Sequence, residues 1–106
     1  MIDAAAVGEI LAQYDKHGWK LRRALLSPDS KSVFSNFDAD VELVDSDFDA
    51  LWFSRRSNPE SEAWELRRVT GAPFALVVVV SAEDDGEELE AALAHIEDEM
   101  RERILA

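Results

Sequence analysis

The fold is decided by residues 47–81, which contain three runs rich in aromatic and β-branched residues: Phe48-Asp-Ala-Leu-Trp-Phe-Ser-Arg-Arg56, Ala63-Trp-Glu-Leu-Arg-Arg-Val69 and Pro73-Phe-Ala-Leu-Val-Val-Val-Val-Ser81. Residues 57–61 and 70–72 separate these runs and carry the Asn, Pro and Gly that favour turns. Each run has the composition of a strand, and short connections join sequential strands in antiparallel order. The stretch therefore predicts a β-meander, against which the rest of the chain packs.

The segment before the meander predicts one helix and one strand. Apolar residues at positions i, i+3, i+4 and i+7 predict an N-terminal helix over Ile2 to Tyr14: Val7, Ile10, Leu11 and Tyr14. Gly18 suits the left-handed conformation that ends such a helix. A strand is expected from Trp19 to Leu26, and the shorter run from Val41 to Val44 is a candidate for a further strand.

The C-terminal region predicts a second helix, over Asp85 to Leu105. Asp85 and Glu88 have the spacing of a capping box, and an apolar stripe follows at helical spacing: Leu89, Leu93, Ile96, Met100 and Ile104. These elements predict an α+β two-layer sandwich in the order α-β-β-β-β-α. Its antiparallel sheet of about four strands carries the N-terminal and C-terminal helices on one face. The length of 106 residues is that of a single domain, residues 1–106.

The order of the strands is predicted from the run Phe74 to Val80, which is entirely apolar. A long apolar strand at a free edge templates aggregation, so we expect its edge to be covered. One solution pairs it with the Trp19 to Leu26 strand, giving the order 1-4-3-2; the other pairs it with a second subunit. We expect the first, because the long connection at residues 27–46 can cross one end of the sheet.

The motif Trp-x-x-Arg-Arg occurs three times, beginning at Trp19, Trp52 and Trp64. Because side chains alternate along a strand, we expect the three Trp on the face that packs against the helices. The first Arg of each pair projects from the opposite face together with apolar neighbours, and these residues are the candidate contact site: Arg22, Arg55, Arg67, Leu51 and Phe53. A hairpin with an even pairing sum places Trp52 and Trp64 on one face.

That face has two interpretations. The arginines can pair across strands with neighbouring carboxylates, which is an ordinary surface arrangement of small stabilising value. Alternatively, aromatic and aliphatic residues interspersed with Arg have the composition of an interface. A partner segment or a second copy of the chain would then cover the face.

The composition excludes several classes of partner. The net charge of −12 and the pI near 4.4 disfavour nucleic acid and anionic membranes, both of which require a cationic footprint. No apolar run is long enough to cross a bilayer, and the N-terminus lacks the order of a signal peptide. The chain has no Cys, which excludes disulfides and thiolate chemistry. We therefore expect a soluble cytoplasmic protein.

No motif predicts an enzyme, a cofactor or a metal site. Asp38, Asp40, Glu42 and Asp49 imitate calcium-loop spacing, but Leu43 occupies the position that requires Gly. The sequence has no phosphate-binding loop, nucleophile elbow or paired-His metal motif. We expect a small acidic non-catalytic protein-interaction module (adaptor, chaperone-like or inhibitor-like) that binds a protein or peptide, or itself as a homodimer. The alternative is a binder of, or an enzyme acting on, a small anionic ligand through Arg22, Arg55 and Arg67.

Overall fold

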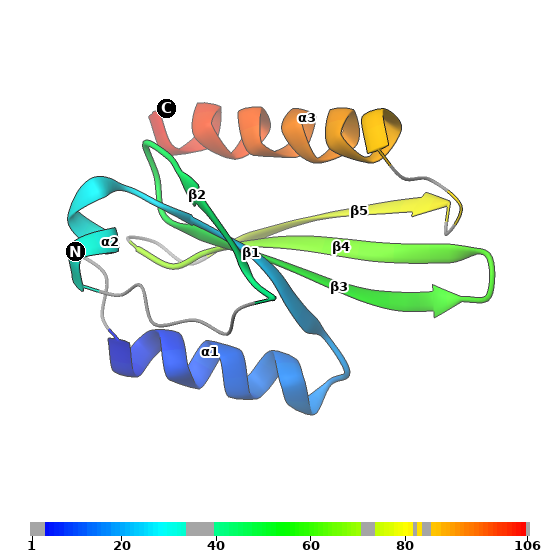
Figure 1. Cartoon of the computed structure of the whole chain (residues 1–106), viewed down its shortest axis with the longest axis horizontal. Helices are drawn as coiled ribbons and strands as arrows, with labels where there is room; N and C mark the ends of the chain where they lie inside the picture. The colour runs from blue at the N-terminus through cyan, green and yellow to red at the C-terminus, as the bar shows by residue number, and fades with distance from the viewer. Residues whose placement is uncertain (1–3, 34–39, 71–73, 82, 84–85, 106) are drawn as a thin grey trace.

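Residues 4–33, 40–70, 74–81, 83 and 86–105 are described by the computed structural model of the chain (Figure 1). The fold is α+β, with helices first and last and a mixed five-stranded sheet between them. The elements are α1 (Ala4–Lys16), β1 (Lys20–Leu26), α2 (Pro28–Val33), β2 (Glu42–Asp45), β3 (Ala50–Asn58), β4 (Ser61–Arg68), β5 (Ala75–Ser81) and α3 (Gly86–Leu105). The predicted α+β class, with helices first and last, is confirmed. The helix α2 and the strand β2 are additional to the predicted order of elements, and because β2 pairs in parallel with β1 the sheet is mixed and not purely antiparallel as predicted.

The strand order is β2-β1-β3-β4-β5, so β5 lies at one edge. β1 pairs with β3, and the predicted order, in which the first strand neighbours the last, is wrong. The reason lies in the connection after β1. It contains α2 and returns through β2, which pairs with β1 in parallel on the side away from β3. The predicted meander is confirmed, because β3, β4 and β5 pair sequentially and antiparallel.

The two long helices lie on opposite sides of the sheet (Figure 1). Leu93, Ile96 and Met100 of α3 pack in one core with Trp52 and other sheet residues. Val7 of α1 packs in a second core on the other face, with Ala24, Leu26, Leu51 and Phe53. The fold therefore has three layers, and the prediction that both helices share one face is wrong.

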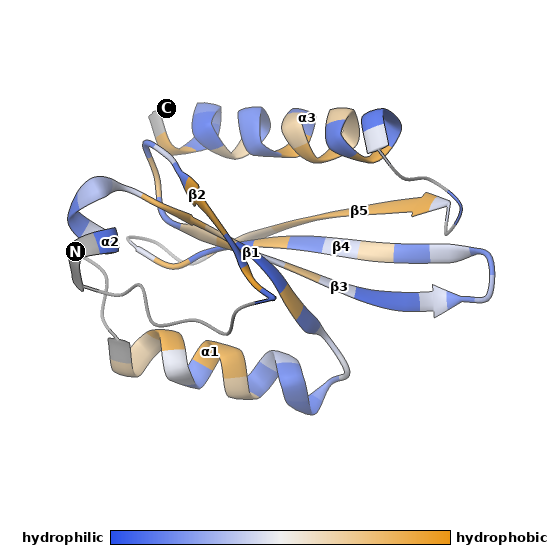
Figure 2. Ribbon diagram, in the orientation of Figure 1, coloured by the Kyte–Doolittle hydropathy of each residue, from blue (hydrophilic) through white to orange (hydrophobic). Residues whose placement is uncertain are grey.

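The sequence of β3 explains this third layer. Ala50, Leu51, Trp52 and Phe53 are consecutive and all at most 1% exposed, so both faces of this strand require cover. Such a continuous apolar run is typical of a strand buried on both faces, whereas alternation indicates burial on one. In contrast to β3, the helix α3 is buried on one side only: Figure 2 shows that its side away from the sheet is hydrophilic.

A β-bulge at Arg22 determines which face each residue of β1 occupies. Leu21 pairs with Phe53, whereas Arg23 pairs with Trp52, so Arg22 is an additional residue between them. An inserted residue interrupts the alternation of side chains between faces. Trp19 and Leu21 consequently join the α1 core, and the prediction that Trp19 shares a face with Trp52 and Trp64 is wrong.

The register of the β3–β4 hairpin is the predicted one. Trp52 pairs with Leu66 and Ser54 pairs with Trp64, so the pairing sum is even. Trp52 and Trp64 share the α3 core, with their ring centroids 6.2 Å apart and their planes at 77°. This edge-to-face geometry is a preferred arrangement of aromatic pairs.

Candidate interaction surface

The two edges of the sheet differ in length and charge. β2 has four residues, and its Glu42 and Asp45 form ion pairs with Arg23 (3.0 Å) and Lys31 (2.8 Å). β5 has seven residues, none of them charged. Short strands and charged side chains are the usual protection of a sheet edge against pairing with another chain. β2 has this protection, and β5 lacks it.

The two faces of β5 have different surroundings. Leu76, Val78 and Val80 are half-buried and pack against the α3 core. Val77 and Val79, on the opposite face, are 53% and 59% exposed. These are the most exposed large apolar side chains in the described part of the chain. The alternation explains why an all-apolar strand can occupy an edge, since only every second residue requires burial.

The exposed face of β5 continues onto β4, where Arg67 pairs with Ala75 and Glu65 pairs with Val77. Directly paired residues on adjacent strands lie on the same face of a sheet. We call this surface the open face and define it by five residues: Glu65, Arg67, Ala75, Val77 and Val79. Its composition is apolar with one charge of each sign, on a chain whose net charge is −12.

The structure does not bring the five sequence-predicted site residues together. Leu51 and Phe53 are 0% and 1% exposed beneath α1, so the expectation that they line an open surface is wrong. Arg55 and Arg67 lie on the α1 side of the sheet, at positions that share a face with Phe53 and Leu51. Only these two of the three arginines remain on a common face.

Arg22 lies on the α3 side of the sheet because of the bulge. Its guanidinium is 5.0 Å from the centre of the Trp64 ring and donates to the Ser54 hydroxyl at 3.1 Å. It also forms an ion pair with Glu62 at 3.7 Å. For Arg22, the structure therefore agrees with the first of the two interpretations, in which the arginines form ion pairs with carboxylates on other strands.

A pocket of about 420 Å³ adjoins the open face at the C-terminal end of α1. It is lined by residues of α1, of the segment between α1 and β1, and of the two strands β3 and β4: Gln13, Tyr14, His17, Trp19, Arg55 and Glu65. Arg55 lies over the Trp19 ring at 4.5 Å and donates to the backbone oxygen of His17 at 3.0 Å. A second cavity, of about 630 Å³, lies between α1 and Arg67, with Gln13 common to both.

Tyr14 forms the inner wall of the 420 Å³ pocket. Its ring stacks on Phe53 with a centroid separation of 4.0 Å, and its hydroxyl donates to the Glu65 carboxylate. Burial, followed by the hydrogen bond to Glu65, raises the pKa of Tyr14 well above its ordinary value. Tyr14 is therefore a neutral hydrogen-bond donor at physiological pH.

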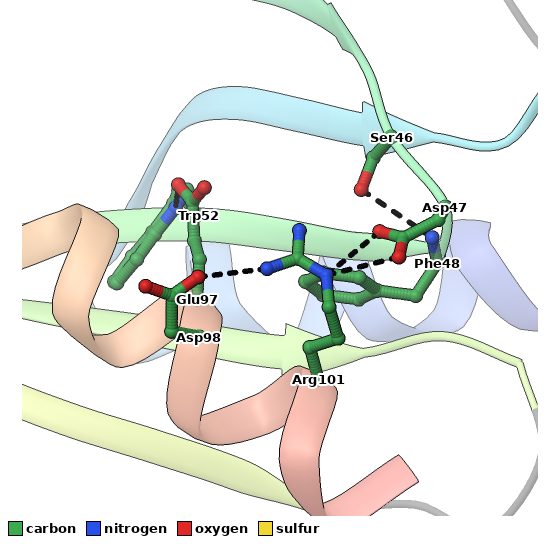
Figure 3. Close-up of polar contacts among 7 residues, drawn as sticks. All are labelled: Ser46, Asp47, Phe48, Trp52, Glu97, Asp98 and Arg101. Carbon is green, nitrogen blue, oxygen red and sulfur yellow. Dashed lines mark hydrogen bonds and ion pairs between the residues drawn. The ribbon is translucent and has the colours of Figure 1, made fainter. Parts of the chain in front are cut away.

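A polar cluster on the other side of the sheet fastens the end of α3 (Figure 3). Arg101 donates to both oxygens of Asp47, at 3.0 and 2.9 Å, and to Asp98 at 2.8 Å. The hydrogen bond from Arg101 lowers the pKa of the Asp47 carboxyl below its ordinary range. Beside it, the buried Trp52 indole donates to Glu97 at 2.8 Å. Each group in this cluster has a partner, which is typical of a structural contact.

Comparison with protein-family models, with curated proteins and with solved structures finds no match to this chain. Within the described ranges, no group of three or more His, Asp or Glu side chains is arranged to hold a metal ion. None of the helices in those ranges is long and apolar enough to span a membrane. Functional inference therefore depends on the geometry of the open face and the adjoining pocket.

Sequence reasoning missed two features of this region. The sequence favours pairing of the Phe74 to Val80 strand with the Trp19 to Leu26 strand, whereas in the structure β5 lies at an edge of the sheet. Of the pocket residues, the sequence predicts Tyr14 on the apolar face of the N-terminal helix and Trp19 on the face shared with the other two tryptophans. No sequence pattern marks the bulge at Arg22 that moves Trp19 next to Arg55.

Proposed function

We propose that the protein is a non-catalytic interaction module that binds another chain by strand addition at the edge of β5. The observation that carries this proposal is the combination of an unprotected seven-residue edge with the exposed Val77 and Val79 beside it. In strand addition, backbone hydrogen bonds supply affinity and alternate side chains supply specificity. The proposed location is the cytoplasm.

The partner that fits best is a second copy of the chain, giving a homodimer. An antiparallel pair of β5 strands centred on Val78 places Val77 of each copy opposite Val79 of the other. This register uses the full strand, from Ala75 to Ser81, and joins the exposed apolar positions of both copies. Such a contact is isologous and closes on itself, so it ends at two subunits.

The net negative charge of the chain opposes dimerisation, although β5 itself carries no charged residue. Two copies that each carry −12 repel one another, and salt screens that repulsion. β5 contains only apolar residues and one Ser, so pairing buries no unpaired charge. The dimer is therefore expected to strengthen as ionic strength rises.

Light scattering after size exclusion tests the proposal, using the wild type, Val77→Lys and a matched control at the other edge. Leu43 of β2 is 41% exposed, so Leu43→Lys makes the same change on an edge that is not proposed to pair. We expect a dimer for the wild type and Leu43→Lys, and a monomer for Val77→Lys, because a Lys on an edge strand opposes pairing. A wild type that is monomeric at every concentration would overturn the dimer. So would a Val77→Lys variant that remains dimeric.

A binder of a small anionic ligand through three arginines is the second candidate. The separation of Arg22 from Arg55 and Arg67 removes the arrangement that it required. Binding of a small ligand is still favoured at one place, the 420 Å³ pocket that Arg55 lines.

A further inference from the structure

Arg55 and Glu65 are neighbours of opposite charge that do not pair. Arg55 pairs across the hairpin with Ala63, and Phe53 pairs with Glu65, so Arg55 and Glu65 are diagonal positions on one face. Side chains at such positions are normally within reach of each other. Among the described residues, however, no carboxylate lies within ion-pair distance of Arg55, although most cations of this acidic chain have one.

Glu65 and Arg55 each contact other residues in place of one another. The Tyr14 hydroxyl binds Oε2 of Glu65, and no described donor contacts Oε1. Arg55 is drawn over the Trp19 ring and to the His17 carbonyl. Only one of the five guanidinium N–H groups is used by a described acceptor. Both groups therefore retain hydrogen-bonding capacity.

The space that both residues line is the 420 Å³ pocket. Its volume lies at the small end of the range for ligand sites, roughly 300–1,000 Å³. Its walls combine the aromatic rings of Tyr14 and Trp19 with polar groups, which is the usual composition of a small-molecule site. Because a cation and an anion both line the space, a ligand with a single charge would satisfy one and face repulsion from the other.

We propose that this pocket binds a small zwitterion of the amino-acid class, with its carboxylate at Arg55 and its ammonium group at Glu65. The planar guanidinium offers parallel N–H donors to a carboxylate, and a Trp ring beneath it keeps the guanidinium in place. The free carboxylate oxygen of Glu65 accepts from the ammonium group. The aromatic walls contact the ligand side chain. Glu65 belongs both to this site and to the open face beside β5, whereas Arg55 and Trp19 lie outside the open face.

The three indole N–H signals of the protein provide a test with an internal control. Trp19 lines the pocket, whereas Trp52 and Trp64 are buried in the core on the other face. Wild-type protein labelled with ¹⁵N is titrated with free amino acids, with the corresponding amines that lack the carboxylate, and with the acids that lack the amine. We expect an amino acid to shift the Trp19 signal, leaving those of Trp52 and Trp64 unchanged, and each truncated analogue to be much weaker.

Two variants test the assigned partners, with a third as the matched control. Arg55→Gln and Glu65→Gln each remove one charge-assisted contact and should weaken binding by about tenfold to a hundredfold. Arg56 is the next residue along β3, faces the α3 side and pairs with Glu62, so Arg56→Gln should leave binding unchanged. An unmoved Trp19 signal in the wild type would overturn the proposal. An acid without an amine that binds as well as the amino acid would also overturn it.

Discussion

Val77 and Val78 are consecutive residues of β5 that face opposite sides of the sheet: Val77 is 53% exposed opposite Glu65, and Val78 packs against the α3 core opposite Trp64. The same residue type therefore has two roles, separated by one position. Val78 packs against the core of the fold, and Val77 faces solvent.

Lysine substitutions at these two positions are expected to have different effects. Val78→Lys places an ammonium group against the α3 core and should lower the free energy of unfolding by about 1–3 kcal/mol. Val77→Lys should change it by less than about 0.5 kcal/mol within the monomer, because its side chain points to water. Urea unfolding at low protein concentration measures both. Equal destabilisation by the two variants would contradict the assignment of faces.

Truncation of Phe53 tests the burial of the α1 face. Phe53 is 1% exposed and stacks on Tyr14, so Phe53→Ala should lower the free energy of unfolding by about 3–5 kcal/mol. Leu66→Ala, in the α3 core, should cost about 2–5 kcal/mol and serves as the matched substitution on the other face. If Phe53→Ala leaves the stability unchanged, α1 does not cover this face.

Tyr14 is the only tyrosine in the chain, so its ionisation can be followed directly by ultraviolet absorbance. Burial and the bond to Glu65 raise its pKa above the ordinary value of 10.0 in the folded protein. Glu65→Gln should lower that pKa, but not to the ordinary value, because burial is the larger cause. A Tyr14 that ionises in the native protein at its ordinary pKa would contradict this environment.

The raised pKa of Tyr14 has a consequence for stability. A group whose folded pKa exceeds its unfolded pKa contributes stability that is fully present below the unfolded pKa. That stability is lost as the pH rises through the folded pKa. The protein should therefore become less stable above about pH 10, and Tyr14→Phe should reduce this dependence.

Arg101 and Asp47 give the opposite dependence in acid. The pKa of Asp47 is lowered from its ordinary value of 3.8, so the stability from this pair is present above that value and is lost as the pH falls through the folded pKa. Arg101→Gln should lower the melting temperature at neutral pH, and the difference from the wild type should shrink as the pH falls below the ordinary Asp value of 3.8. A melting-temperature difference that stays constant as the pH falls would show that Arg101 does not stabilise the fold through its ion pair with Asp47.

Much of the fold was predictable because it depends on local patterns. The meander, the N-terminal and C-terminal helices and the shared face of Trp52 and Trp64 follow from periodicity and turn residues. Strand order was not predictable in the same way, because the placement of β2 beside β1 depends on long-range packing. The apolar run from Ala50 to Phe53 did carry a signal for cover on both faces, and reading it as one-sided placed Leu51 and Phe53 wrongly.

The candidate site was less predictable than the fold. The expectation of three arginines on one face assumed strict alternation along each strand. The bulge at Arg22 breaks that alternation and turns Arg22 toward Trp64, while Arg55 remains beside Trp19. Bulges arise from the fit between paired strands, so a single strand sequence does not reveal them.

Disulfide cross-linking of β5 provides the most direct measurement of strand pairing, because the natural chain has no Cys. Val77→Cys and Val79→Cys are prepared separately, mixed and oxidised, and the products are identified by mass spectrometry. An antiparallel pair centred on Val78 brings the two engineered positions opposite one another, within reach of a disulfide. We expect the mixed dimer to form far faster than either homodimer. Contradiction would come from a mixture that stays monomeric, or from Leu43→Cys, on the β2 edge, cross-linking as readily.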